Sequence, residues 1–576
     1  MINDRNPRWA TLLLVLLAIA TSPYFVRLGA SSLWDSNEAF YAETPREMAE
    51  SSDFISPRFN YQPRFNKPPL SYWIVAGFYE LFGVSVTIER LAIVLGGLGI
   101  VAIAYALTRI AFCHEAALVA AAMLASSPRL LMFARRIMID VYVSLFMGLA
   151  LLFFALASST PNRRRTYLSL MYCSIGLGVL TKGPIALLLP TVAIGVFLIF
   201  ARKPGEIRKL MLPAGVLIIA AIVLPWYAAV YAQHGWRYIE AFLLEDNLSR
   251  YAERAWGPTR SFLFYIPVLA VDLFPSSIFL APGVWLAFKL QRAPATGSEQ
   301  TEEKEQEQNA EQTLRNRLPL LYAVWLAVIV VFFSLSKSKE DLYILPVYPA
   351  AAALSGIISW QLLSRQLTGR MYTATRWLLG CGGLLFAIAG AAGAYLLSYR
   401  ESSYALAGAG LFGSAAFVGG VLTILSAKQR LSTLAIVALV VFVSIINWGF
   451  VLITLPDFER YKPVAQLCKT IQDRASDDAL IGYYRLASPS MVFYLRRPVF
   501  EFYEPKELQQ ALCSGKEVFC IIPRSDYEAL RPLLPVETHV LASSPVFQVK
   551  LKRILDKVSP PQVLLISNTV EQTTEQ

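Results

Sequence analysis

Apolar runs of membrane-spanning length are the dominant feature of this 576-residue chain. A helix needs about 20 mostly apolar residues to cross the hydrocarbon core of a bilayer, and such runs recur along the chain to about residue 455. The composition agrees, because only 16% of the residues are charged, whereas soluble proteins average about 25%. We therefore predict an α-helical polytopic membrane protein with about thirteen spans. The predicted spans are 9–29, 87–110, 115–134, 138–159, 167–182, 184–201, 209–232, 261–289, 317–335, 342–364, 373–397, 404–427 and 432–455.

Basic residues in the short loops predict how the spans are oriented. Lys and Arg collect in the cytoplasmic loops of membrane proteins. Four short loops are basic in this way, at 163–165, 202–209, 365–370 and 428–430. With the N-terminus inside, all four are cytoplasmic, and an odd number of spans places the C-terminal part outside. The net charge of +11 follows from the same rule, so we predict the lipid bilayer, and no nucleic acid, as a partner.

The chain divides into two predicted domains and a tail. Residues 1–456 form the membrane domain, whose long outer loop, 30–86, contains two segments typical of interfacial helices, 38–52 and 70–83. Residues 457–565 alternate helical and strand patterns, which predicts a small α/β domain outside the membrane. Its expected helices are 458–475 and 505–513, and its expected strands are 481–484, 518–522 and 546–551. We expect a disordered tail at 566–576, and Cys513 and Cys520 could form a disulfide in an oxidising compartment.

Three carboxylates lie close together in the first outer loop. Asp35, Glu38 and Glu43 fall within nine residues of the chain. Such acids can act as a general base or as metal ligands in an outward-facing cavity. They can also simply favour the first turn of a helix. Asn37 and Tyr41 belong to the same segment, and we include them as candidate substrate-binding residues.

Charged residues recur in the other predicted outer loops. Arg64 and Lys67 stand beside a stiff proline pair, where they could bind a substrate phosphate or reach lipid headgroups. Arg135 and Asp140 mark the edge of the fourth span, where ionisable residues form either a structural pair or part of a site. The remaining candidates are Lys182, Glu245, Asp246, Arg250, Lys337, Lys339 and Tyr343.

Together these residues predict one active site at the outer boundary of the membrane. They lie in five outer loops, and few charged residues occur in the middle of the spans. A transporter would need polar groups near the bilayer midplane, often on broken helices. Cations at the boundary would instead suit a lipid-linked phosphate, and carboxylates there would handle a proton.

Several motifs resemble those of the GT-C membrane glycosyltransferases, and in particular the bacterial relatives of protein O-mannosyltransferases and of the lipid A aminoarabinose transferase. They are AsnGluAlaPheTyrAlaGlu at 37–43, ArgGluMet at 46–48, AsnLysProProLeuSerTyrTrp at 66–73, Asp140, ThrLysGlyPro at 181–184, GluAspAsnLeuSerArgTyr at 245–251, and the SerLysSerLys, Tyr and IleLeuPro elements of 336–346. The resemblance covers about residues 9–350. It implies that a sugar is moved from a polyprenyl-phosphate donor to a lipid A-like lipid, a protein or another envelope acceptor. It also implies that this happens on the outer face of a bacterial cytoplasmic membrane.

The resemblance further implies an acidic catalytic residue in the first loop. This chain has Asn37 where relatives usually have aspartate, and Asn66 where the lipid A enzyme has glutamate. An amide is not a base at neutral pH, so Asp35 or Glu38 would orient or deprotonate the acceptor. A phosphate acceptor, already ionised, would need little base catalysis.

The predicted reaction is a direct displacement at the anomeric carbon of the sugar. Cations would stabilise the departing phosphate, and the candidates are Arg64, Lys67, Lys182, Arg250 and Lys337. Asp140 would orient a cation or contact the sugar, and Tyr41 and Tyr343 would bind donor phosphate or sugar hydroxyls. No cofactor is assigned, and a divalent cation stays open because relatives differ in metal use. Two other functions fit part of the pattern, namely a flippase for a lipid-linked sugar and an inactive scaffold that has lost its catalytic acid at Asn37.

Overall fold

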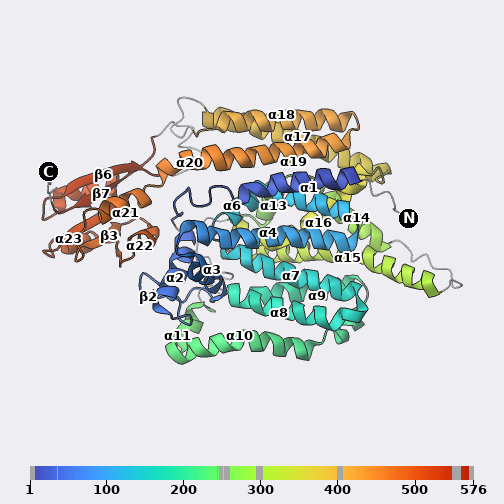
Figure 1. Cartoon of the computed structure of the whole chain (residues 1–576), viewed down its shortest axis with the longest axis horizontal. Helices are drawn as coiled ribbons and strands as arrows, with labels where there is room; N and C mark the ends of the chain where they lie inside the picture. The colour runs from blue at the N-terminus through green and yellow to red at the C-terminus, as the bar shows by residue number, and fades with distance from the viewer. Residues whose placement is uncertain are drawn as a thin grey trace.

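The computed structural model describes residues 7–35, 37–242, 244, 251, 260–292, 303–398, 406–547 and 559–569. Most of these residues form a bundle of long helices that run along the long axis of the molecule (Figure 1). The bundle helices are α1 (Pro7–Thr21), α4 (Val86–Ala111), α5 (His114–Ala125), α6 (Pro128–Ala134), α7 (Ile139–Ser159), α8 (Arg164–Lys182), α9 (Ile185–Phe200), α10 (Leu212–His234), α13 (Tyr265–Asp272), α14 (Leu280–Arg292), α15 (Glu303–Leu335), α16 (Tyr348–Leu363), α17 (Gly369–Ser398), α18 (Ala409–Lys428) and α19 (Ser432–Gly449).

Eight helices in the described ranges are long and apolar enough to cross a membrane, and two bent helix pairs raise this number to ten. The bent pairs are α5 with α6 and Phe262–Asp272 with Ser276–Gln291. The prediction of a multi-span helical membrane protein is therefore confirmed, but the count of about thirteen is not. The predicted spans at 9–29 and 184–201 are shorter apolar helices, Trp9–Tyr24 and Ile185–Phe200.

Small residues allow the central helices to pack closely. A Cβ atom added at Gly356 in α16 would lie 2.5 Å from the Cβ of Ala120 in α5, and one added at Gly97 in α4 would lie 2.5 Å from the Cβ of Ala134. Close backbone approach through Gly and Ala is the usual way in which membrane helices gain packing contacts. It makes α16, whose described residues are almost all buried, the centre of the bundle.

The segment predicted to be the first outer loop, 30–86, is folded rather than extended. It contains α2 (Asn37–Ser51), a hairpin of β1 (Arg58–Phe59) and β2 (Gln62–Pro63), and α3 (Leu70–Phe82). The two helices coincide closely with the segments 38–52 and 70–83 in which helices were expected. Although α2 is polar in sequence, most of its residues are buried, including three glutamates and Arg46. Such a helix must pair its charges internally, and these pairs form much of the candidate site.

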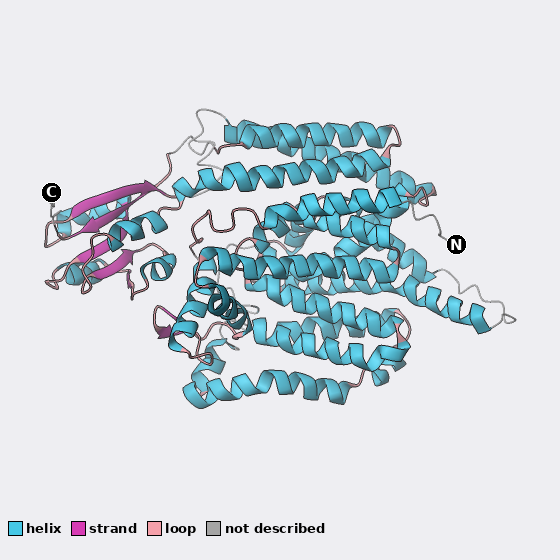
Figure 2. Cartoon of the chain, viewed as in Figure 1, coloured by secondary structure: helices cyan, strands magenta, loops and turns pink. Residues whose placement is uncertain are grey.

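The C-terminal region forms a five-stranded sheet with helices on both faces (Figure 2). The strand order is β4-β3-β5-β7-β6, in which β3 pairs in parallel with β4 and β5, and β7 pairs antiparallel with β5 and β6. The strands are β3 (Leu480–Tyr484), β4 (Phe500–Phe502), β5 (Val518–Pro523), β6 (His539–Pro545) and β7 (Gln562–Ser567). Helices α21 (Val464–Gln472) and α22 (Ser490–Leu495) share one apolar core with the sheet, and α23 (Pro505–Leu512) and α24 (Arg524–Leu530) share the other.

Some predicted details of this region differ from the structure. The strand expected at 546–551 is found earlier, as β6, and residues 548–551 lie outside the described ranges. Strand β7 extends to Ser567, two residues past the expected domain end, and most of the expected tail, 570–576, is outside the described residues. Cys513 and Cys520 are not paired, because Cys520 is buried within β5 whereas Cys513 is exposed at the end of α23.

The sheet region lies at the end of the bundle that also carries α2, α3 and the β1–β2 hairpin, and the described chain begins near the opposite end (Figure 1). The two parts touch directly, because Phe59 and Tyr61 of the hairpin pack against the core formed with α21 and α22. The first outer loop is therefore held between the helical bundle and the C-terminal sheet.

Candidate active site

Three predicted residues from three distant segments meet at one end of the bundle. The ammonium group of Lys182, at the end of α8, forms an ion pair with Asp140 in the first turn of α7. The same ammonium lies 4.8 Å from the ring centre of Tyr343, a cation–π contact. Asp140 is buried and Lys182 is partly exposed, so the cation is held by protein on one side and remains accessible on the other.

A glycine turn fixes the position of Lys182. Helix α8 ends at Gly183, whose φ of +89° is favourable only for glycine. A Cβ atom there would also lie 2.5 Å from the ring of Phe242. The ThrLysGlyPro motif therefore ends one helix and starts the next within a single turn, and it leaves the Lys182 side chain at the rim.

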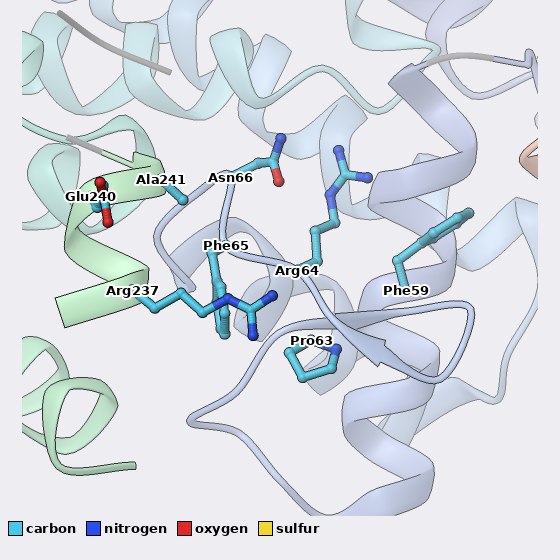
Figure 3. Close-up of a pocket in the computed structure, with 8 residues that line it drawn as sticks. All are labelled: Phe59, Pro63, Arg64, Phe65, Asn66, Arg237, Glu240 and Ala241. Atoms are coloured by element: carbon cyan, nitrogen blue, oxygen red, sulfur yellow. The ribbon is translucent and has the colours of Figure 1, made fainter. Parts of the chain in front are cut away.

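A pocket of about 460 Å³ opens at the same end of the bundle, between the β1–β2 hairpin and α11 (Trp236–Ile239) (Figure 3). Its lining combines two arginines and one glutamate with aromatic and small side chains. The lining residues are Phe59, Pro63, Arg64, Phe65, Asn66, Arg237, Glu240 and Ala241. Phe65 belongs to the aromatic cluster that also contains Leu180, Tyr238 and Phe242, so the pocket and Lys182 lie against the same apolar cluster.

The two pocket arginines stack on aromatic rings and pair with no carboxylate among the described residues. The guanidinium of Arg64 lies 3.7 Å from the ring centre of Phe40, and that of Arg237 lies 5.9 Å from the ring centre of Phe65. Neither arginine, nor Glu240, forms an ion pair with another described residue. Stacked guanidinium groups without an acidic partner are suited to binding a phosphate or a carboxylate of a ligand.

Helix α2 carries a buried cluster of charges. The Arg46 guanidinium donates to both carboxylate oxygens of Glu43, at 2.7 Å from its Nε, and it also bonds Glu50 at 2.5 Å and the Tyr61 hydroxyl at 3.2 Å. Glu47 accepts from the backbone N–H of Tyr61 at 2.9 Å. Burial, and next the adjacent Glu43, raises the pKa of Glu47 to about 8. Glu43 is therefore a structural partner of Arg46 rather than a group facing the pocket.

Glu47 makes the stability of this loop depend on pH. Because the pKa is about 8 in the folded protein and about 4.3 in an unfolded chain, the folded state holds one extra proton between these values. The free energy of unfolding should fall by up to about 1.4 kcal/mol for each pH unit from roughly pH 5.5 to 7.5. Melting temperatures of the purified protein, measured across this range, should fall accordingly.

The matched variant for this prediction is Glu47→Gln, which stays neutral and can still accept from Tyr61. It should lose this component of the pH dependence and be more stable than the parent protein at pH 8. Equal slopes for the two proteins would show that Glu47 is ionised in the folded state.

Glu38 forms an ion pair with Arg90, a residue that was not among the predicted site residues. Arg90 bonds Glu38 through its Nε at 2.9 Å, and both side chains are buried. Arg90 also donates to the backbone carbonyls of Leu28, Ser31 and Ser32. Burial by itself would raise the pKa of Glu38, but Arg90 holds it below its usual range. A carboxylate so stabilised is a weak base, which argues against the predicted proton-accepting role of Glu38.

Asp35 faces the C-terminal sheet region and not the pocket. Its carboxylate accepts from the backbone N–H of Ser490 at 3.1 Å and from the Ser490 hydroxyl at 2.5 Å. Burial raises the pKa of Asp35 to about 6, against the opposing effect of these hydrogen bonds. The contacts therefore do not place Asp35 where it could deprotonate an acceptor in the pocket.

Two other predicted substrate-binding cations are used within the protein. Arg135 donates to the carbonyls of Pro23 at 2.6 Å and Val26 at 2.8 Å, and it is buried. Lys339 is also buried and donates to the carbonyl of Ser336 at 2.5 Å. Both geometries correct the expectation of direct ligand contact, because buried donors that bond backbone carbonyls hold the chain in place.

The remaining predicted residues are distributed as follows. Lys337 and Asn37 are exposed and Lys67 is half-buried, while Tyr41 stacks on Tyr72 with ring centres 5.8 Å apart. Glu245, Asp246 and Arg250 lie outside the described residues.

An ion network that sequence reasoning missed supports the segment carrying Tyr343. Arg129 in α6 forms ion pairs with Asp272, at 3.4 Å, and with Asp341. Asp272 also accepts from the hydroxyl of Tyr348 at 3.4 Å. These residues could have been found from the sequence, because each charge stands at the edge of an apolar run, where an unpaired charge is costly. Arg90 also stands at the edge of an apolar run and could have been found in the same way.

No three His, Cys, Asp or Glu side chains gather into a metal-binding group within the described ranges. Asp140, Glu38 and Glu43 are each paired with a cation instead.

Known proteins are similar to this chain in sequence and in fold. Residues 66–228 match the family model described as dolichyl-phosphate-mannose-protein mannosyltransferase. The chain is 30% identical over 344 residues to an uncharacterised protein of Aquifex aeolicus, covering 60% of this chain and 62% of that one. It is 30% identical over 356 residues to undecaprenyl phosphate-alpha-4-amino-4-deoxy-L-arabinose arabinosyl transferase 2 of Pseudomonas fluorescens, covering 61% of this chain and 56% of that one. The alignments thus span less than two thirds of these relatives.

The fold matches over its whole length. The crystal structure of ArnT from Cupriavidus metallidurans bound to undecaprenyl phosphate superposes with a TM-score of 0.76 at 22% identity, covering 99% of this chain and 100% of that one. The chain therefore has the ArnT type of membrane fold, and the predicted resemblance is confirmed. Within that class, the chain resembles the protein O-mannosyltransferase and ArnT type.

Proposed function

We propose that this protein is a glycosyltransferase that moves a sugar from a polyprenyl-phosphate donor to an envelope acceptor such as a lipid A-like lipid. The observation that carries the proposal is the meeting of Lys182, Asp140 and Tyr343 at the end of the bundle that also holds a pocket with two arginines, neither of which pairs with a described carboxylate. These groups lie at the end of an apolar helical bundle, where the phosphate of a lipid-linked donor would lie at the membrane surface. The relatives named above support the donor class, since one is named for undecaprenyl-phosphate-linked aminoarabinose and another was crystallised with undecaprenyl phosphate.

The chemistry would be a single displacement. An acceptor oxygen forms a bond to the anomeric carbon, and the bond from that carbon to the donor phosphate oxygen breaks, so polyprenyl phosphate leaves with the electron pair. Lys182 would stabilise the charge that develops on this phosphate, and Asp140 would hold Lys182 in place. Tyr343, whose ring contacts the Lys182 ammonium, would bind the sugar or the phosphate next to it.

The absence of a free base among the predicted catalytic acids favours an acceptor that is already ionised. Asp35, Glu38 and Asp140 all have partners in the structure. A phosphate group needs no deprotonation at neutral pH, so it could attack without a base. If the acceptor is a hydroxyl group instead, Glu240 is the pocket carboxylate available to take its proton.

We also propose that the end carrying α2, α3 and the sheet region faces the periplasm of a bacterial cell. The basic loops at 163–165 and 202–209 adjoin the other ends of α7 and α9, as expected for a cytoplasmic face. A cysteine accessibility experiment, in which Ser543 and Ser158 are replaced one at a time by cysteine, would test this orientation.

The function is tested by direct assay. Purified protein in lipid nanodiscs is incubated with a panel of radiolabelled polyprenyl-phosphate sugars together with envelope lipids and outer-membrane lipid A. Transfer from at least one donor is expected, and it should depend on the pocket, so Arg64→Ala should reduce it while Arg524→Ala, on the sheet region, should not. Lack of transfer with every donor would reject the proposal, and movement of an intact donor across a vesicle membrane would favour the flippase instead.

A further inference from the structure

The segment 31–35, which leads into α2, contacts the C-terminal region at every residue. The Lys462 ammonium donates to the hydroxyl of Ser31 at 3.0 Å, and Glu459 accepts from the N–H of Ser32 at 2.9 Å. The Tyr494 hydroxyl accepts from the N–H of Leu33 at 2.7 Å. The Trp34 ring stacks on Phe458 with ring centres 5.2 Å apart, and Asp35 accepts from Ser490.

A second contact fixes the hairpin to the same region. The side-chain amide of Asn60 donates to the carbonyl of Val499 at 2.7 Å, and its oxygen accepts from the N–H of Val499 at 2.9 Å. The pairing is reciprocal, so it fixes distance and orientation together. Two elements that line or precede the candidate site are thus attached to one folded unit.

We infer that the C-terminal region positions the first outer loop for sugar transfer, and that Asp35 is a positioning residue through which this occurs. The inference rests on the proposed function for its effect on transfer, but its structural part does not. Segment 31–35 leads directly to Asn37 and to Tyr41 in α2, and Tyr41 stacks on Tyr72 in α3, which follows Lys67. Releasing the segment at Asp35 would therefore loosen the side of the site that carries Lys67.

The substitutions Asp35→Ala and Asp35→Asn distinguish positioning from proton transfer. Asparagine keeps an oxygen that accepts from Ser490, but it cannot act as a base. We expect Asp35→Asn to keep transfer within about threefold of the parent protein and Asp35→Ala to lower kcat/KM by about tenfold, the size expected for a lost hydrogen bond to a charged group. Ser490→Ala should resemble Asp35→Ala, and the double variant should be no worse than either. Ser543→Ala, on the exposed side of the sheet region, is the matched control.

Hydrogen exchange of residues 28–35 gives a readout that does not depend on transfer. The amides of Ser32 and Leu33 should exchange faster in Asp35→Ala and Ser490→Ala than in the parent protein, with little change in melting temperature. An Asp35→Asn variant as inactive as Asp35→Ala would overturn the positioning role in favour of catalysis. Unchanged exchange in Ser490→Ala would overturn the attachment itself, whereas normal exchange effects without any transfer activity would reject only the proposed function.

A different observation, at the opposite end of the bundle, carries a second inference. A pocket of about 210 Å³ lies between the ends of α7 and α9, the start of α8, and α15. It is lined by three cations, Arg164, Lys203 and Arg317, and by the single carboxylate of Glu206. Glu206 is already shared, because it bonds Arg164 at 2.9 Å and Lys209 at 2.8 Å.

Lys203 and Arg317 have no carboxylate partner among the described residues, and they repel each other. Partial burial, and then Arg317, lowers the pKa of Lys203. The Nε of Arg164 is buried without a hydrogen-bond partner in the described part of the chain. The other wall of the pocket is apolar, with Phe154, Phe197 and Leu321. Excess positive charge next to an apolar wall at the membrane edge suits a phosphate that carries acyl chains.

We propose that this inner pocket binds the headgroup phosphate of an anionic lipid. Addition of phosphatidylglycerol to the detergent-solubilised protein should raise its melting temperature by about 3–5 °C, and phosphatidylcholine should not. The double variant Lys203→Gln/Arg317→Gln should lose the effect, whereas Lys428→Gln/Arg370→Gln, in two other basic loops, should keep it. An equal shift with inorganic phosphate would assign the pocket to a free anion, and an equal shift in both double variants would overturn the site.

Discussion

Replacing Lys182 by alanine is expected to lower sugar transfer by about 100- to 1,000-fold, which is the usual cost of removing one group that stabilises charge in a transition state. Lys182 is the described cation that combines a fixed position with exposure at the rim, because Asp140 holds it and the Gly183 turn directs it. The effect should appear mainly in kcat, since the phosphate gains charge as the sugar leaves. Initial rates with a saturating donor would measure it.

Controls must separate a loss of transition-state stabilisation by Lys182 from the loss of the ion-pair partner of Asp140. Lys182→Ala leaves Asp140 buried and unpaired, which is costly by itself, so Lys182→Ala/Asp140→Asn should restore the melting temperature without restoring transfer. Lys182→Arg should keep part of the activity, and Lys209→Ala, which removes an exposed lysine, should change nothing. Recovery of transfer in the Lys182→Ala/Asp140→Asn protein would show that Lys182 is structural.

The sequence was sufficient to predict where the polar groups of the site gather. The length of each apolar run predicts which segments cross a membrane, and the charged residues lie in the loops between them. The residues Asp140, Lys182 and Tyr343 were predicted from separate loops, and the structure brings these three together. Their meeting could be expected since loops on the same side of a short bundle converge. The helices at 38–52 and 70–83 were also predictable from local pattern.

The roles of individual carboxylates were not predictable, because they depend on partners far away in the chain. Glu38 is bound by Arg90, 52 residues later, and Asp35 by Ser490, 455 residues later. No local pattern encodes either pairing. The count of about thirteen spans was not confirmed, because several apolar runs form short or bent helices, and hydropathy alone does not determine where a helix ends or bends.

Replacing Arg90, in α4, by leucine is expected to lower the free energy of unfolding by about 3–5 kcal/mol, because it leaves Glu38 buried without its counter-charge. The adjacent Glu89 is also fully buried, and neither of its carboxylate oxygens has a hydrogen-bond partner among the described residues. Arg90 further holds three backbone carbonyls of the segment 28–32. Melting temperature and the yield of monodisperse protein should both fall.

The double variant Arg90→Leu/Glu38→Leu decides what Glu38 does. Replacing a buried ion pair by apolar residues of similar size is often close to neutral for stability, so the double variant should fold better than Arg90→Leu. If Glu38 is only a partner of Arg90, the double variant should also retain measurable transfer, reduced by the lost carbonyl contacts. Arg109→Leu, at the exposed far end of the same helix, is the matched control and should behave like the parent protein. A double variant that is stable yet wholly inactive would show that Glu38 takes part in catalysis. Because the pKa of its carboxyl group is lowered, Glu38 would then act as a fixed negative charge beside the sugar and not as a base.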